Sequence, residues 1–391
     1  MSLQFDEYEI VKYRSGFKRQ VLELQAYLWG PDLGINAAYL EWKYSDNPYV
    51  NNTIIHIALH AGRVVGMRGA FGNCWQSGVP SQTMICLTDS DGVVHPEHRR
   101  HGLFGRLTMA VVEELSSHDY EYLIALSANP ITAHSLLKLG WRSTVPLQTA
   151  YWQAEQGRDS SLRGFARKLP FLSSVYRQWR RYRNRFFSQT PGNRFPFASL
   201  DQNVSQAGPD DSTCISVEKA PQPKAMADLV ERIGSDGRIR HVRDQRFFAW
   251  RYKNPLSLYR FFFYKDAKLE GFLVLQTSAF AVDSNWVDIV DWEATNTQVL
   301  ADLLQAAIQR GNFHRLVIRW ATLTDEEKIQ LKDQGFVFPE EIDGPASDTY
   351  RPSVLVRPVH QEKLSGDWTF GNRRMLDVAD WDVRPIYSDN F

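Results

Sequence analysis

The chain has 391 residues, 43% of them hydrophobic, and its 45 basic and 45 acidic residues give a formal net charge of zero. This length favours two domains over one, and the balanced charge argues against a dedicated nucleic-acid-binding protein, so we expect no nucleic-acid partner. The three cysteines lack a CxxC spacing, which argues against a disulfide framework and a structural zinc site. The sequence has no apolar run of about eighteen residues and begins without a signal-peptide pattern, so we expect a cytoplasmic protein.

The first part of the chain predicts a strand, a helix and a β-hairpin. Residues 8–13 alternate weakly between apolar and polar side chains, and residues 21–29 carry an apolar stripe at helical spacing. The segment LEWKYSDNPY follows, and after it two runs rich in β-branched residues are joined by a short turn. These runs predict hairpin strands at residues 53–59 and 64–71.

The stretch at residues 93–107, VVHPEHRRHGLFGRL, joins a predicted strand to a predicted helix. Residues 84–91 form the strand, Pro96 ends it, and apolar residues at helical spacing begin at Leu103. Backbone N–H groups at a helix start and basic side chains meet there, and this combination binds phosphate or pyrophosphate. The stretch has neither the GxxxxGKS/T of a Walker loop nor the GxGxxG of a dinucleotide fingerprint. The alternative is a surface turn with solvated arginines.

This stretch resembles motif A of the GCN5-related N-acetyltransferase (GNAT) family. The matching residues are Val94, Pro96, Arg99, Gly102 and Leu107. The resemblance implies that the turn holds the pyrophosphate of coenzyme A and that the strand end pairs with its pantetheine arm. The coenzyme-binding residues implied here are Val93, Val94, Arg99, Arg100, His101, Gly102, Leu103, Phe104 and Gly105. Phe104 stands where the family usually has glycine or alanine.

The segment SANPITAHSLLKLGW, at residues 127–141, resembles motif B of the same family. The matching residues are Asn129, Ala133, Lys138, Gly140 and Trp141. The resemblance implies that Asn129 helps to hold the pantetheine arm, and that the helix after it splays away from the preceding strand, residues 121–127, and leaves a slot for the cofactor. The motif B tyrosine, which often serves as general acid, falls at Leu136, so the acid remains unassigned.

The chain also contains an internal repeat, because residues 247–276 reproduce the segment that begins at residue 39. The corresponding pairs are Trp42 and Trp250, Tyr44 and Tyr252, Asn47 and Asn254, Pro48 and Pro255, and Gly66 and Gly271. No Arg-x-x-Gly turn follows the predicted strand at residues 286–292. We therefore expect a degenerate copy that keeps the scaffold without the coenzyme site and walls the acceptor pocket. The alternative is a separate structural lobe.

The predicted fold class is α/β (α+β), with two tandem GNAT-like domains, each a mixed, mostly antiparallel, splayed sheet flanked by helices. Residues 1–153 form the domain with the intact loop, residues 154–213 a basic amphipathic linker, and residues 214–391 the degenerate domain and C-terminal tail. Residues 158–194 hold ten basic residues against one acidic residue, with aromatic residues at helical spacing. We expect a helix pair between the lobes. The alternatives are weak contact with an anionic membrane and a cradle for an anionic acceptor.

Acetyl transfer to an amine requires a base that takes a proton from the amine. Asp89 and Asp91, on the strand that enters the loop, are the candidate catalytic residues, and Asp91 is preferred because it lies nearer the expected carbonyl site. Alternation places both on one face, where burial and like charge raise a carboxyl pKa. The alternative is that they orient the loop or bind the cation of the acceptor.

The resemblance implies an N-acetyltransferase that uses acetyl-coenzyme A and acts on the amine of a small acceptor, such as an amino sugar or an amine-bearing antibiotic. We expect no metal, since His95, His98 and His101 lie across a turn rather than on one helical face. The alternatives are a tandem-GNAT aminoacyl transferase of the peptidoglycan-bridge type and a non-catalytic coenzyme A-binding protein. The oligomeric state stays open.

Overall fold

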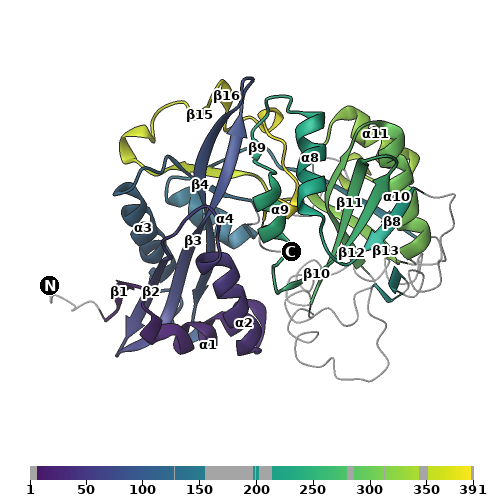
Figure 1. Cartoon of the computed structure of the whole chain (residues 1–391). Helices are drawn as coiled ribbons and strands as arrows, with labels where there is room; N and C mark the ends of the chain where they lie inside the picture. Colours follow the sequence, from purple (N-terminus) through teal and green to yellow (C-terminus); the bar gives the residue numbers. More distant parts are fainter. Residues whose placement is uncertain are drawn as a thin grey trace.

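The structure, a computed structural model, describes residues 7–126, 128–154, 197–198, 200–201, 214–279, 286–311, 313–342 and 351–388. These residues form two α/β lobes that lie side by side, each with a central sheet and flanking helices (Figure 1). We call them the first and the second lobe, in chain order. The basic segment at residues 158–194 lies outside the described residues, so the linker and membrane predictions stay predictions.

The first lobe has an eight-stranded mixed sheet. Its strands, in spatial order, are β1 Glu9–Lys12, β2 Ile54–His60, β3 Arg63–Ser77, β4 Gln82–Val94, β5 Tyr122–Ala125, β14 Leu355–Pro358 and β6 Arg142–Ser143, with β9 Arg240–His241 paired to the outer part of β3. Its helices are α1 Lys18–Trp29, α2 Leu33–Leu40, α3 Leu103–Ser116 and α4 Pro130–Lys138. Neighbouring strands are antiparallel except β4 and β5, which run parallel.

Helices cover both faces of this sheet because successive side chains of a strand point to opposite faces. On β2, Ile55 and Ile57 pack with α1 and α2, whereas Ile54 and Ala58 pack with α3. The predicted phosphate-binding turn lies at the start of α3. The face covered by α3 is therefore the one that faces the expected coenzyme site.

The second lobe repeats this plan on a six-stranded sheet. Its strands, in spatial order, are β7 Gln148–Gln153, β13 Arg315–Ala321, β12 Trp286–Ala294, β11 Leu269–Ser278, β10 Ser257–Lys265 and β8 Ile215–Glu218. Its helices are α8 Pro223–Ile233, α9 Gln245–Arg251, α10 Thr297–Gly311, α11 Asp325–Asp333 and α12 Pro339–Ile342. The parallel pair is β12 and β13, the counterpart of β4 and β5. The predicted tandem α/β architecture is confirmed.

The two sheets exchange strands. β7 follows β6 in the sequence but pairs with β13 of the second sheet, whereas β14, from the C-terminal part, lies between β5 and β6 of the first sheet. The second sheet therefore contains one strand from the first part of the sequence, β7, and the first sheet contains two strands from the second part, β9 and β14. The predicted boundary at residue 153 falls directly after a strand that belongs to the second sheet.

The repeated tryptophans form the junction between the lobes. The rings of Trp42 and Trp250 stack with centroids 5.1 Å apart and an interplanar angle of 14°. Nε1 of each ring donates a hydrogen bond to the main-chain carbonyl of the other tryptophan, at 2.9 Å in both directions. Each tryptophan thus makes the same hydrogen bond to the other. Such a reciprocal contact is typical of two copies related by an approximate two-fold axis.

The hairpin of β3 and β4 runs further than the predicted strands at residues 64–71 and 84–91. Its outer part holds Trp75, which is fully buried and packs edge-on against His241 and Trp381. These partners come from β9 and the C-terminal tail, so a local pattern does not reveal them. The tail, residues 351–388, adds the short strands β15 Thr369–Phe370 and β16 Arg373–Arg374 (Figure 1, yellow). No helix among the described residues combines the length and apolar character that a membrane crossing requires.

We expect Trp42→Ala to destabilise the whole chain, because it removes a buried ring, its stacking on Trp250 and the hydrogen bond that Trp42 Nε1 donates. The free energy of unfolding should fall by about 3–5 kcal/mol, the usual range for a buried Trp→Ala change. Trp286→Ala is the control, since Trp286 is 48% exposed. Chemical denaturation of both variants checks this, and equal losses for the two would contradict the junction.

Candidate active site

The predicted phosphate-binding turn forms as expected. β4 ends at Val94, a short 3-10 turn spans Pro96–His98, and α3 follows with Gly102 as its N-cap. Gly102 has φ +70°, a left-handed conformation that glycine adopts without strain. Within the described chain, the backbone N–H groups of residues 100–105 make no hydrogen bond. Unpaired N–H groups at the start of a 14-residue helix can hold an anion.

Charge and exposure agree with an anion site at this turn. Arg99, Arg100, His101 and Gly102 are all exposed. Arg99 Nε donates to the Val94 carbonyl at 3.1 Å, which holds this guanidinium beside the end of β4. A Cβ built on Gly102 meets no atom within 4 Å, so the outer side of the turn is open. The geometry of the turn therefore suits coenzyme A, and the assignment of residues 99–105 to coenzyme A binding stays a prediction.

The strands β4 and β5 part at the place where the slot is predicted. Their parallel pairing covers only Leu87 with Leu123 and Thr88 with Ile124, and in the described chain β4 then continues to Val94 while β5 ends at Ala125. Beyond the slot, Asn129 caps α4, its Oδ1 accepting hydrogen bonds from the N–H groups of Ile131 and Thr132 at 3.0 Å. The assignment of Asn129 to the pantetheine arm stays a prediction.

A β-bulge interrupts β4 beside this slot. Gly69 pairs with Ser90 and Met67 with Val93, so Arg68 faces two residues, Asp91 and Gly92. Asp91 has φ +53°, a left-handed value that is uncommon for a residue other than glycine. The bulge turns the strand, so the strict alternation on which the sequence prediction relied ends at Asp91.

The two candidate carboxylates therefore lie in different surroundings, and the prediction that they share one face is wrong. Asp91 and Ser90 both contact Lys43, with Lys43 Nζ 3.1 Å from an Asp91 oxygen. The Tyr44 hydroxyl donates to Asp91 at 2.6 Å. Asp89 instead forms an ion pair with Arg68 on the face covered by α3.

Both carboxylates are closed off from solvent. The side chain of Asp91 is 0% exposed and that of Asp89 is 1% exposed. Burial raises the pKa of the Asp89 carboxyl, and the Arg68 guanidinium acts in the opposite direction. An amine reaches either carboxylate only after an ion pair has opened. This geometry favours the alternative that they position the strand, and their role as bases stays a prediction.

The second lobe repeats the tyrosine contact. The Tyr252 hydroxyl donates to Asp291 at 2.8 Å, as Tyr44 does to Asp91. The second copy has no phosphate-binding turn after β12, yet it keeps this contact, so the contact belongs to the scaffold. The repeat of Tyr44 as Tyr252 was the available signal for this contact, but the sequence alone did not connect these tyrosines to the aspartates.

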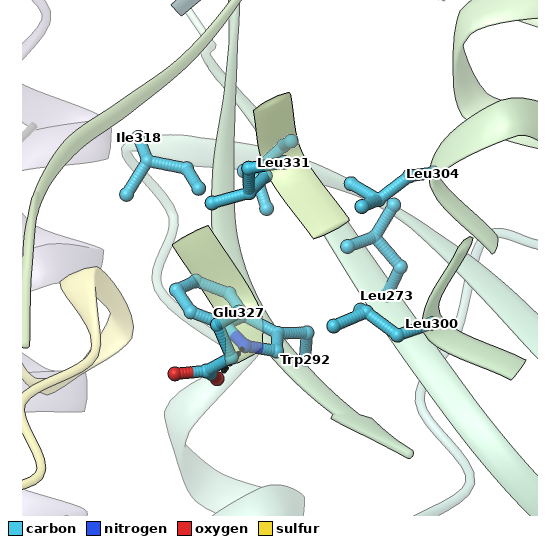
Figure 2. A pocket seen from close by; sticks show the side chains of 8 residues that line it. Leu273, Trp292, Leu300, Leu304, Ile318, Glu327 and Leu331 are labelled. Carbon is cyan, nitrogen blue, oxygen red and sulfur yellow. Dashed lines mark hydrogen bonds between the residues drawn. The ribbon is translucent and has the colours of Figure 1, made fainter. Parts of the chain in front are cut away.

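The second lobe has no room for a cofactor at the equivalent place. Trp292 directly follows Asp291, as Gly92 follows Asp91. It lines a small pocket together with Glu327 of α11, to which its Nε1 donates at 2.7 Å (Figure 2). The remaining space is about 10 Å³, no more than one water molecule needs. It is lined by Leu273, Ile289, Trp292, Leu300, Leu304, Ile318, Glu327 and Leu331. This agrees with the predicted degenerate copy.

Leucine occupies the motif B tyrosine position in both copies. Leu136 is fully buried, and its carbonyl accepts from the N–H of Trp141 at 3.2 Å. The Leu331 carbonyl likewise accepts from Phe336 at 2.9 Å. Neither copy can provide a tyrosine acid from this place.

The histidines beside the turn bind tyrosines. His98 and the Tyr8 hydroxyl are 3.1 Å apart, and His95 and the Tyr27 hydroxyl are 3.0 Å apart. Desolvation and then the neighbouring His60 and His95 lower the pKa of His98. Within the described ranges, no three or more His, Cys, Asp or Glu residues are grouped to hold a metal ion.

Comparison with known proteins identifies the fold. No protein-family model matches the sequence, and no curated protein matches it. Among solved structures, a GCN5-related N-acetyltransferase from Anabaena variabilis matches with a TM-score of 0.55 at 11% identity, covering 90% of this chain and 73% of that one. A probable N-acyltransferase from Enterococcus faecalis matches with a TM-score of 0.51 at 9% identity and the same coverage, 90% and 73%.

A third match, a GCN5-related N-acetyltransferase from Kribbella flavida, has a TM-score of 0.50 at 13% identity, with 90% of this chain and 71% of that one covered. The chain therefore has the fold of GNAT acetyltransferases, which confirms the predicted fold. The reaction must be argued from the residues of the site.

We expect Asp91→Asn to destabilise the chain, because it leaves the fully buried Lys43 ammonium without its carboxylate. Breaking a buried ion pair from one side costs about 3–5 kcal/mol. Glu23→Gln, which removes the exposed ion pair between Arg19 and Glu23, should have little effect. Urea denaturation of both variants decides this, and an unchanged midpoint for Asp91→Asn would refute a structural role.

Proposed function

We propose that the chain is an N-acyltransferase that uses acetyl-coenzyme A and acts on the amine of a small acceptor. The observation that carries this proposal is the open, basic turn at the start of α3, directly beside the place where β4 and β5 separate. A turn with unpaired N–H groups suits a pyrophosphate, and a gap between parallel strands suits the extended arm attached to it. The second lobe keeps the strands but lacks the basic turn, and Trp292 lies where its parallel strands part.

The residues of the first lobe fit the coenzyme. The N–H groups of residues 100–105, with Arg99 and Arg100, would bind the pyrophosphate, and the main chain of Val93 and Val94 would lie along the arm. The coenzyme would supply the activated thioester. The amine nitrogen would form a bond to the carbonyl carbon and give up a proton, the carbon–sulfur bond would break, and the thiolate that leaves would take up a proton.

Proton transfer to the predicted bases, Asp91 and Asp89, would require an ion pair to open first. Asp91 and Asp89 face Lys43 and Arg68 instead of an open cleft, and Leu136 has no proton to give. The buried aspartates and the missing tyrosine support a second candidate function, that of a protein that binds coenzyme A without catalysing a reaction. Release of free thiol from acetyl-coenzyme A in the presence of a panel of amines separates the two, because a binding protein releases none.

Gly102→Glu should abolish binding of acetyl-coenzyme A, since it places a carboxylate where the pyrophosphate binds. Gly234→Glu is the matched control, because both glycines have positive φ, +70° and +85°, and neither has an atom within 4 Å of an added Cβ. Both variants carry backbone strain, and the strain is greater in the control, because Gly234 has ψ −165°, a region almost restricted to glycine, whereas Gly102 has ψ 7°. Isothermal titration calorimetry checks this, and equal affinity in the two variants would remove the assignment of the turn.

Gly92→Trp should close the slot of the first lobe as Trp292 closes that of the second. An added Cβ at Gly92 already overlaps the guanidinium of Arg68, so a ring there must displace this side chain. We expect affinity for acetyl-coenzyme A to fall at least about tenfold, equivalent to 1.4 kcal/mol, although the turn itself is unchanged. Gly16→Trp, at an exposed glycine with no atom within 4 Å of an added Cβ, should bind normally. Unchanged affinity in Gly92→Trp would place the arm elsewhere.

A further inference from the structure

A buried ion pair lies in the slot of the first lobe, between the bulge of β4 and the first turn of α3. The side chains of Arg68 and Asp89 are 4% and 1% exposed. The Arg68 guanidinium lies over the Phe104 ring, 4.7 Å from its centroid. An added Cβ at Gly92 would overlap the same guanidinium. The pair therefore occupies the place in the first lobe that Trp292 fills in the second.

The scaffold does not require charge at these two positions. Arg68 lies two residues after Gly66, as Leu273 does after Gly271, and Asp89 lies two residues before Asp91, as Ile289 does before Asp291. In the second lobe, Leu273 and Ile289 form an apolar lining. A buried ion pair is often no more stabilising than apolar side chains of similar size. Packing alone therefore does not explain the Arg68–Asp89 pair.

The pair also leaves hydrogen-bonding capacity unused. One Arg68 terminal nitrogen donates to one Asp89 oxygen. Arg68 Nε and the other oxygen, Asp89 Oδ1, are buried and have no hydrogen-bond partner in the described chain. Buried polar atoms in folded proteins are nearly always satisfied, so an unsatisfied donor and acceptor on neighbouring side chains point to a bound group.

We propose that Arg68 and Asp89 recognise the acyl group of the donor, and that they select an acyl group carrying a hydroxyl near the thioester. The inference rests on the proposed function, because it requires an acyl-coenzyme A in this slot. A hydroxyl can accept from Arg68 Nε and donate to Asp89 Oδ1 at the same time. An unsubstituted hydrocarbon satisfies neither atom, and a carboxylate is repelled by Asp89.

The position along β4 favours the acyl group over the arm of the coenzyme. The arm is assigned to the main chain of Val93 and Val94, next to the turn that takes the pyrophosphate. Asp89 lies four residues further from that turn, on the order of 10 Å along a strand. A ligand that enters from the turn reaches Arg68 and Asp89 last, and the last part of an acyl-coenzyme A is its acyl group.

The test compares 3-hydroxybutyryl-coenzyme A, butyryl-coenzyme A and free coenzyme A by isothermal titration calorimetry with the full chain. We expect the hydroxyacyl compound to bind about tenfold more tightly than butyryl-coenzyme A, the effect of one satisfied donor and acceptor. Equal affinities in the unmodified chain would overturn the inference without any variant. If free coenzyme A fails to bind at all, the proposed function fails instead.

The matched variant carries the residues of the second lobe, Arg68→Leu with Asp89→Ile. It removes both charges together, so no buried charge is left unpaired. We expect it to lose the tenfold preference and to keep its affinity for free coenzyme A within about threefold. A parallel loss of affinity for all three compounds would show that the pair serves the arm or the fold, and would overturn the inference.

Discussion

One short segment links the junction of the lobes to the candidate site. In Glu41–Ser45, Trp42 stacks on its counterpart Trp250, and the two following residues, Lys43 and Tyr44, both bind Asp91 at the bulge of β4. The left-handed conformation of Asp91 is thus held by a segment that is itself fixed between the lobes. The bulge and the parting of β4 from β5 depend on this chain of buried contacts, so the site of the first lobe depends on the presence of the second.

The comparison between the copies separates scaffold from function. The tryptophan contact, the tyrosine–aspartate contact and the parallel strand pair occur in both lobes. Three features occur in the first lobe only: the basic turn before α3, the glycine at position 92, and the ion pair in the slot. The second lobe replaces the last two with Trp292, Leu273 and Ile289. Residues that differ in this way within one scaffold are the best candidates for ligand binding.

Local patterns in the sequence predicted the elements that depend on neighbouring residues. The strand, turn and helix at residues 93–107 and the repeat of Trp42 in Trp250 belong to this group. The strand exchange could not be predicted, because β14 pairs with a strand more than 200 residues earlier in the chain. The bulge was missed because Asp91 is not a glycine, and its positive φ depends on buried contacts with Lys43 and Tyr44. The prediction from strict alternation therefore placed Asp91 on the same face as Asp89, which is wrong.

Amide hydrogen exchange at the turn tests the central claim most directly. The N–H groups of residues 100–105 have no partner in the described chain and should exchange rapidly in the free protein. If these groups bind the pyrophosphate, saturating acetyl-coenzyme A slows exchange in the peptide that covers them and leaves the start of α10 in the second lobe unaffected. Unchanged exchange at residues 100–105 in the presence of bound acetyl-coenzyme A would contradict the account.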